Sequence, residues 1–273
     1  MSVSGAESSV SDFYDAAVAS RFFPDLRAPQ VAELITDRSI FVQPIGAIEQ
    51  HGPHLPFSTD LVIAQAVSEA TVAERGDELD LWMLPPLAYT KSNEHAWSHG
   101  TVWLSAETLL AVLRDVGRCL ATLPARRLVF MNGHGGNSAL LQMMNRELRL
   151  SYGLMTFTTH PGVPADQGGT SAPSELRMGV HAGEDETSLM LHLRPDLVDM
   201  SVAIRNVPEW LAENRYVRFG GTVSFGWLSN DFGPAGHIGD PTAASPERGK
   251  ELFEGSVRTF GEALAEVARF ELP

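Results

Sequence analysis

The stretch RLVFMNGHGGNSALLQMMNREL, residues 127–148, joins an apolar run to a glycine-rich turn and then to a helical pattern. Residues 127–133 indicate a strand buried on both faces, because the run is short, apolar and ended by glycine. Beyond the turn, apolar side chains recur three and four positions apart, as in a helix with one face in the core (Leu140, Leu141, Met144 and Leu148). A strand that passes directly into a helix predicts a βα unit of an α/β protein.

The same alternation of strands and helices extends to both sides of this unit. Further strands are expected at residues 39–46, 79–87 and 153–160. Further helices are expected from Asp60, from Ser105, near Gly183 and after Ser245 and Pro246. Strands separated by helices predict a mainly parallel sheet with helices on both faces.

No feature of the sequence divides the chain into two domains. Residues 1–12 are rich in serine and predict a flexible N-terminus. Residues 13–273 contain no linker and predict a single domain. The Gly- and Pro-rich stretch 219–246 is too long for a plain connection, which favours a structured loop that covers a site.

The composition narrows the class of protein. The chain has 34 Asp and Glu against 20 Lys and Arg, and its formal net charge of −14 argues against nucleic acid or an anionic membrane as partner. No apolar run approaches the length of a transmembrane helix, and the N-terminus lacks the pattern of a secretory signal. The single cysteine, Cys119, excludes an internal disulfide and is expected to be buried in the core. These features predict a globular cytoplasmic protein.

Polar side chains follow the first predicted strand in the segment EQHGPH, residues 49–54. Glu49 and His51 are two positions apart, so in an extended segment they point to the same side. Carboxylate oxygen with imidazole nitrogen suits zinc, manganese or iron. Asp60 stands where the chain enters a helix, and it suits a helix N-cap and a metal ligand equally. His54 either orients a ligand or only fills the turn.

A second polar segment, NGHGGN, follows the strand at residues 127–133. The carboxyl ends of parallel strands meet at one edge of a sheet, so His134 is expected beside the first polar segment. Backbone N–H groups of the turn could assist an oxyanion, and its last residue could cap the next helix (Gly135, Gly136 and Asn137). The chain has no G-x-S-x-G, P-loop or G-x-G-x-x-G sequence, which disfavours serine-hydrolase, phosphate and dinucleotide sites.

The third polar segment, HAGEDETSLMLHL, occupies residues 181–193. Glu186 shares its predicted helical face with three apolar side chains (Leu189, Met190 and Leu193). An inward-facing carboxylate is costly unless it is paired or bound to a metal, so Glu186 is a better ligand candidate than Glu184 or Asp185. The alternative is a buried carboxylate that caps a neighbouring loop. His181 precedes the helix and could face the same pocket, and two residues after the second strand could line it (Glu94 and His95).

The three segments in this order resemble the creatininase (creatinine amidohydrolase) family over about residues 35–200. The resemblance implies a three-layer α/β/α sandwich with a parallel sheet, assembled into homo-oligomers, commonly hexamers. It also implies a two-metal site that hydrolyses C–N bonds of amides. On the matching positions, it assigns metal ligation to four residues and makes Asp60 the bridge between the ions (Glu49, His51, Asp60 and His134).

This sequence also departs from the family's type enzyme. That enzyme reads N-G-H-Y-E-N, with its glutamate a ligand of the second metal, where Gly136 stands here; we expect Glu186 to supply the ligand instead. The tryptophans that close over creatinine have no counterpart in TFTTHPG and LRMGVHAG, so creatinine is not the expected substrate. Other members with N-G-H-G-G-N include formamidopyrimidine-type deformylases, a peptidase-like protein that matures a peptide-derived cofactor, and a keto-inositol hydrolase.

We therefore predict a metal-dependent hydrolase of a small cyclic or formylated amide, with one or two Zn, Mn or Fe ions and no nucleic-acid or membrane partner. The ions would lower the pKa of a bound water, while Glu184 or His181 moves the proton. The turn residues and His95 would contact the substrate or its oxyanion (Gly135, Gly136 and Asn137). The alternatives are a peptidase that trims a short peptide, a carbon–carbon hydrolase of a cyclic keto-polyol, and a non-catalytic binding protein. The last would have lost its ligands, yet all of them are present.

Overall fold

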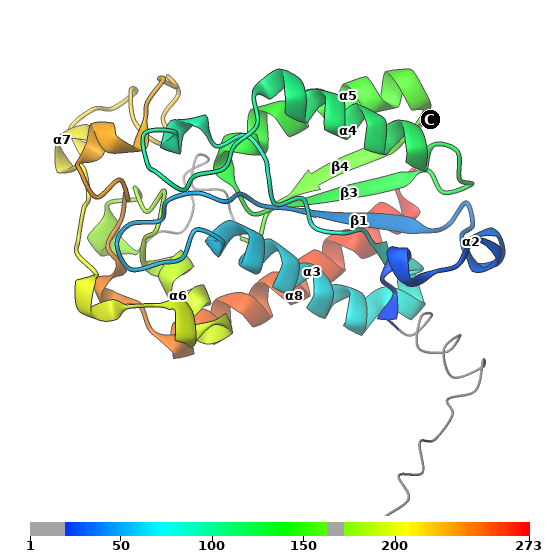
Figure 1. Ribbon diagram of the computed structural model, residues 1–273, viewed down its shortest axis with the longest axis horizontal. Helices are drawn as coiled ribbons and strands as arrows, with labels where there is room; N and C mark the ends of the chain where they lie inside the picture. The colour runs from blue at the N-terminus through cyan, green and yellow to red at the C-terminus, as the bar shows by residue number, and fades with distance from the viewer. Residues whose placement is uncertain (1–19, 163–171) are drawn as a thin grey trace, which may run out of the picture.

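The computed structural model describes residues 20–162 and 172–273, so the N-terminus expected to be flexible lies outside the described residues. Its centre is a four-stranded parallel sheet of order β2-β1-β3-β4 (Figure 1). The strands are β1 (Ile40–Ile45), β2 (Leu81–Met83), β3 (Arg127–Asn132) and β4 (Met155–Thr159). The parallel sheet expected from the alternation of strands and helices is confirmed.

Side chains of the central strands alternate between two separate cores. In β1, Phe41 and Ile45 pack under α4 (Ala106–Leu120) and α5 (Ser138–Tyr152). Ile40 and Val42 point the other way, against α3 (Thr59–Leu79) and α8 (Pro246–Arg269). Figure 1 shows these helix pairs on opposite faces of the sheet. The fold is thus the three-layer α/β/α sandwich that the sequence predicted.

The second strand is shorter than its sequence suggested. Residues 79–87 are expected to be extended, but α3 continues to Leu79 and the continuous ladder with β1 covers Leu81–Met83; past the two prolines, Leu87 forms one isolated parallel bridge with Ile45. Asp80 ends the helix in a left-handed conformation, with φ of 52°. Pro85 and Pro86 follow, and proline lacks the N–H that a strand would need for further pairing. An additional short helix, α2 (Ala28–Leu34), precedes β1 and was not anticipated.

The remaining elements surround one end of the sandwich. Helix α6 (Glu184–Leu193) packs against α8, and the close approach falls at Gly249, where an added Cβ would collide with the Ser188 carbonyl oxygen. Within residues 219–246, Phe219 and Ile238 join a small apolar core with Met178 and Leu211. The short elements are α7 (Glu209–Ala212) and the 3-10 turns Phe23–Asp25, Asn93–His95, Gly135–Asn137, Pro173–Glu175, Pro195–Leu197, Met200–Val202, Ser229–Phe232 and Pro241–Ala243.

The strand order creates a binding position at the carboxyl end of the sheet. The chain leaves β1 through α3 to reach β2 on one side, whereas β3 and β4 lie on the other side of β1. The order therefore reverses between β1 and β3, and ligands of open parallel sheets bind in the crevice at such a point.

The position of Cys119 and the polarity of the helices bear on two expectations drawn from the sequence. Cys119 is exposed, so the expectation that it is buried is wrong: the core-facing positions of α4 are Leu109, Leu113 and Leu120. Within the described residues, every helix is too short or too polar to cross a bilayer.

Candidate metal centre

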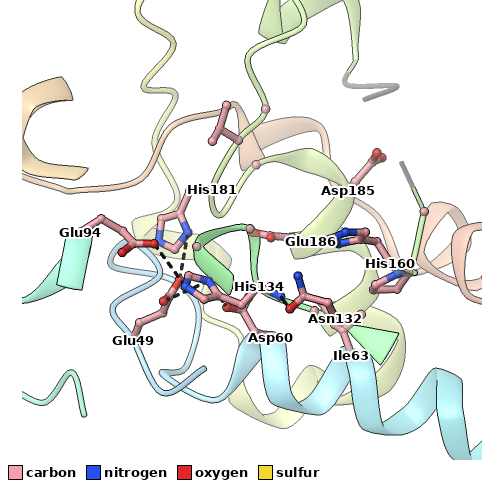
Figure 2. A pocket seen from close by; sticks show the side chains of 18 of the residues that line it. Glu49, Asp60, Ile63, Glu94, Asn132, His134, His160, His181, Asp185 and Glu186 are labelled. Carbon is pink, nitrogen blue, oxygen red and sulfur yellow. Dashed lines mark hydrogen bonds and ion pairs between the residues drawn. The ribbon is translucent and has the colours of Figure 1, made fainter. Parts of the chain in front are cut away.

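Side chains from four segments meet beyond the carboxyl ends of β1 and β3 (Figure 2). They are Glu49 and His51 from the loop after β1, Asp60 from the first turn of α3, His134 after β3, and Glu186 from the first turn of α6. All but Glu186 are at least nine-tenths buried. The three polar segments of the sequence therefore come together in space.

These residues form two ligand sets that share Asp60. In the first, called here the Glu49 site, His134 Nδ1 lies 3.3 Å from Glu49 Oε2 and 3.1 Å from Asp60 Oδ2. In the second, the Glu186 site, His51 Nε2 lies 2.9 Å from Asp60 Oδ1 and 4.0 Å from Glu186 Oε2. Asp60 thus offers one carboxylate oxygen to each set. It is not a helix cap, because α3 has Ser58 at its N-cap position.

The donor atoms fit divalent metal ions. Glu49 Oε2 and Asp60 Oδ2 are buried and form no well-aligned hydrogen bond, although the single Nδ1 of His134 lies 3.3 and 3.1 Å from them; buried carboxylate oxygens in such a position favour a cation. In each set the ligand atoms lie within 4.8 Å of one another. Two carboxylates with one imidazole suit zinc, manganese or iron.

The electrostatics of the cluster also call for positive charge. Burial alone would lower the pKa of His51, but Asp60, Glu186 and Glu49 outweigh it and raise that pKa to about 10. Burial raises the pKa of Glu186 to about 7, with Asp60 and Glu49 adding to the effect and His51 opposing it. A protonated His51 thus supplies the positive charge that a metal ion would supply, and an ion would displace that proton.

Glu186 has a second contact in addition to the Glu186 site. Its Oε2 accepts a hydrogen bond of 2.6 Å from the backbone N–H of Ala182. Ala182 has a positive φ of 53°, so this bond holds a strained residue immediately before α6. The two roles considered from the sequence, ligand and loop cap, are therefore compatible in one carboxylate.

His181 presents an unprotonated nitrogen toward Glu49. Its Nε2 lies 2.6 Å from the Gln50 carbonyl oxygen and donates to it, while Nδ1 lies 3.6 Å from Glu49 Oε1. Burial, together with the neighbouring His51 and His95, lowers the pKa of His181 well below its usual value. Glu49, His51 and His181 also satisfy the spacing of a metal set. His181 can therefore accept a proton or bind an ion.

Two of the other predicted site residues line the same pocket. The His95 ring lies 4.2 Å from that of His181 at a tilt of 38°, and its Nε2 lies 3.4 Å from Glu49 Oε1. Glu184 forms no side-chain hydrogen bond or ion pair with the residues that the structure describes. Burial and the adjacent Asp185 raise the pKa of Glu184, which favours its protonated form.

In the turn after β3, the two glycines face the pocket, whereas Asn137 bonds to neighbouring loops. Gly135 and Gly136 line the pocket. The Asn137 N–H instead donates to the His134 carbonyl oxygen, so it is not available for the oxyanion role expected of it. The Asn137 side chain donates to Gly46 O and Thr90 Oγ1 and accepts from the Lys91 N–H, which ties three loops together. Asn137 occupies the N-cap position of α5 without a side-chain capping bond.

Gly136 leaves space that another carboxylate fills. A Cβ at Gly136 would collide with Glu94 Oε1 and His134 Nε2. Glu94 Oε1 lies 3.3 Å from His134 Nε2, which also faces the Lys91 carbonyl oxygen at 2.8 Å. The sequence suggested that Glu94 lines the site, but its contact with a candidate ligand depends on tertiary structure and has no local signal.

The pocket extends well beyond the ligand sets, with a volume of about 540 Å³. Apolar side chains form another part of its lining (Ile63, Leu189, Phe225, Trp227 and Leu252). Phe225 and Trp227 belong to the 219–246 stretch and pack on Phe219 at 5.5 and 5.4 Å. This stretch therefore covers the site, as its composition suggested.

A parallel α/β/α sandwich with a shared-carboxylate ligand cluster at its carboxyl edge defines a metal-dependent hydrolase class. The Creatininase family model, described as creatinine amidohydrolase, matches residues 24–264. This chain belongs to the creatininase family and is a hydrolase of that family.

Named relatives align with this chain over most of its length or over about two thirds of it. A mycofactocin precursor peptide peptidase of Mycobacterium ulcerans (strain Agy99) is 35% identical over 260 residues, covering 89% of this chain and 94% of the relative. A creatinine amidohydrolase of Pseudomonas putida is 35% identical over 192 residues, covering 62% of this chain and 70% of the relative. A solved manganese form of creatininase superposes with a TM-score of 0.68 at 28% identity, covering 90% of this chain and 98% of that structure's chain.

Proposed function

We propose that this protein is a two-metal hydrolase that cleaves an amide C–N bond in a short peptide. The observation that carries the proposal is the placement of Asp60, whose two oxygens face the Glu49 site and the Glu186 site. One carboxylate that belongs to two ligand sets would let Glu49, His134, His51 and Glu186 hold two divalent ions, which together supply Lewis-acid and water-activating chemistry.

The residues of the pocket can divide the remaining work. Bound divalent ions would polarise the amide carbonyl and lower the pKa of water. The neutral His181 can accept a proton at Nδ1, and Glu184 can deliver one to the leaving nitrogen. Backbone N–H groups of Gly135 and Gly136 border the same space and can support a developing oxyanion.

The size of the pocket supports a peptide over a small ring. A cavity of about 540 Å³ is in the range that holds a drug-sized ligand, and its lining continues from the ligand sets to Phe225 and Trp227. The mycobacterial peptidases match the chain over most of its length, which supports the same substrate class. A small cyclic or formylated amide is the second candidate, supported by the likeness to creatinine amidohydrolase.

The proposal is tested by measuring metal content and amide hydrolysis together. Wild-type protein loaded with Mn²⁺ or Zn²⁺ is incubated with a panel of short peptides, lactams and formamides, and the products are identified by mass spectrometry. Asp60→Asn weakens both sites, so we expect it to bind fewer than two ions per chain. We also expect hydrolysis to fall by more than about 100-fold, since even outer-sphere changes can cost that much.

A matched control is Asp115→Asn, whose carboxylate is 70% exposed on α4 and, among the described residues, ion-paired only with Arg118. This variant should keep both ions and full activity. Two ions retained by Asp60→Asn, or peptide hydrolysis that survives chelation, would contradict the proposal. Cleavage of lactams or formamides without cleavage of peptides would favour the second candidate.

We further propose that the protein acts in the cytoplasm as a homo-oligomer. Exposed aromatic side chains support subunit contacts, since Tyr89 is 58% and Trp210 is 59% exposed. Light scattering after size-exclusion chromatography measures the assembly directly.

A further inference from the structure

The two outer ligands of the Glu186 site come from segments that are distant in sequence. His51 lies in the turn after β1, and Glu186 lies in the first turn of α6. Their side-chain atoms are 4.0 Å apart. A metal site needs its ligands held close to the correct spacing before the ion arrives, so something must fix the turn against the helix.

Leu55 packs with Leu189 and Met190 of α6 in one apolar cluster, and a buried hydrogen bond adds a directional contact between the turn and the helix. His54 Nε2 lies 3.0 Å from Thr187 Oγ1, although the residues are 133 positions apart. Each partner follows a ligand closely: His54 is three residues after His51, and Thr187 directly follows Glu186. His54 is 2% exposed and Thr187 is fully buried, so water does not compete for the bond.

The surroundings of His54 fix the direction of its ring. Gly52 has a φ of 67°, and a Cβ there would lie 3.0 Å from His54 Nδ1 and 3.3 Å from His237 Cβ. The ring of His237 lies against that of His54 at 5.8 Å. The His54 carbonyl oxygen accepts from the Asp199 N–H, which holds the backbone as well. The imidazole is therefore enclosed on its Nδ1 side, with Nε2 directed at Thr187.

His54 is not itself a ligand in any three-residue metal set among the described residues. A second tie between the same segments, from His181 Nε2 to the Gln50 carbonyl oxygen at 2.6 Å, joins residues that border Glu49. Within residues 20–162 and 172–273, the bond from His54 to Thr187 is the only side-chain hydrogen bond between residues 51–55 and α6.

We propose that His54 is a positioning residue for the second metal ion. Its hydrogen bond to Thr187 fixes the first turn of α6 against the turn after β1, and so sets the distance between Glu186 and His51. The inference rests on the proposed two-metal function, because it assigns a residue that tunes one of those two sites. It predicts that loss of the bond weakens the Glu186 site and leaves the Glu49 site unchanged.

The test uses the full-length metal-free protein and measures ion binding. Thr187→Val removes the hydroxyl group while keeping the side-chain shape nearly constant. Thr187→Ser keeps the hydroxyl group and removes the methyl group. Mn²⁺ titrations followed by calorimetry, with bound metal counted by mass spectrometry, give the two affinities. We expect Thr187→Val to weaken the second ion by about 10- to 100-fold, as is usual when an outer-sphere partner of a ligand is lost. Thr187→Ser should bind both ions with affinities close to wild type.

A matched control separates positioning from general loss of packing. Thr71 is also fully buried, and its Oγ1 donates to Val67 O at 2.8 Å within α3, where its change touches no ligand. Thr71→Val should leave both affinities unchanged. His54→Gln is the second variant; it should weaken the second ion in the same way as Thr187→Val.

The outcomes are distinct. An unchanged second affinity in Thr187→Val, or an equal loss at both sites, would overturn the positioning role while leaving the two-metal function standing. Fewer than two ions in the wild-type protein would overturn the two-metal function itself, and the positioning role with it. A selective loss of the second ion that serine restores supports the inference.

Discussion

At Gly136 the backbone lies against the carboxylate of Glu94 and the ring of His134, which leaves no room for a side chain. By the resemblance described above, a glutamate is expected here in the family's type enzyme; Gly136 carries no carboxylate, and that of Glu94 occupies the adjacent space. Glu94 does not enter either ligand set, but it lies 3.3 Å from the ring nitrogen of His134 that faces away from Glu49. A carboxylate at that nitrogen orients an imidazole ligand and raises its basicity.

Gly136→Ala is therefore expected to disturb the Glu49 site. The new methyl group must displace Glu94 or rotate His134, and we expect the affinity of that site for Mn²⁺ to fall by about 10-fold or more. Gly135→Ala is the matched control, since a Cβ there meets nothing within 4 Å. Calorimetric titration with Mn²⁺ measures the affinity of the Glu49 site in both variants. Equal affinities in Gly136→Ala and Gly135→Ala would contradict this role of Glu94.

The residues with a local sequence signal are ones that the structure brings together. The motifs predicted Glu49, His51 and His134 as ligands, and the apolar face of a helix predicted Glu186; all of them lie in the cluster, and their binding of a metal stays a prediction. The contact of Glu94 with His134 and the bond from His54 to Thr187 had no such signal. Both join segments that only the folded chain brings together, the second across 133 positions.

At the scale of elements, α6 packs against α8 with Gly249 facing the Ser188 carbonyl oxygen. The helices and strands themselves followed from apolar periodicity and from caps such as Ser245, which accepts from the Arg248 N–H. The errors fell where periodicity is ambiguous. The apolar run 79–87 suits a helix end and a strand alike, and the actual boundary depends on Asp80 and on how α3 packs.

Gly249→Ala is expected to push α6 away from α8. Its methyl group would collide with the Ser188 carbonyl oxygen, so we expect a loss of about 1–3 kcal/mol in the free energy of unfolding. Gly255→Ala in the same helix is the control, because its Cβ meets only a flexible Arg258 nitrogen at 3.8 Å. That substitution should stabilise the helix by up to about 1 kcal/mol. Urea unfolding of the metal-free variants measures both, and similar values for the two would refute the packing argument.

For the molecule as a whole, buried histidines make stability depend on pH. Burial, with the neighbouring His237 and His51, lowers the pKa of His54 to about 4 from its usual value of 6.5. The neutral ring is thus favoured in the folded state. Its contribution is complete above about pH 6.5 and is lost progressively as the pH falls from 6.5 to 4, an interval of 2.5 pH units that corresponds to about 3 kcal/mol.

We therefore expect acid to destabilise the wild-type protein more than His54→Gln. Urea unfolding of both metal-free proteins at about pH 7.5 and 4.5 gives the difference, in which the opposite contribution of Glu186 cancels. His99→Gln, an exposed substitution, should follow the wild type at both values. Identical acid sensitivity of wild type and His54→Gln would show that His54 stays unprotonated in both states or is charged in both.

The wide separation of the ligands along the chain also determines when an ion can bind during folding. The Glu186 site is complete only after α6 has docked beside the turn that follows β1, and contacts this distant in sequence carry a large loop-closure cost. An ion that binds only the completed arrangement lowers the energy of the native state and not that of the folding transition state. It therefore slows unfolding and leaves the folding rate nearly unchanged. Metal supply would thus govern how long a folded molecule survives rather than how readily the chain folds.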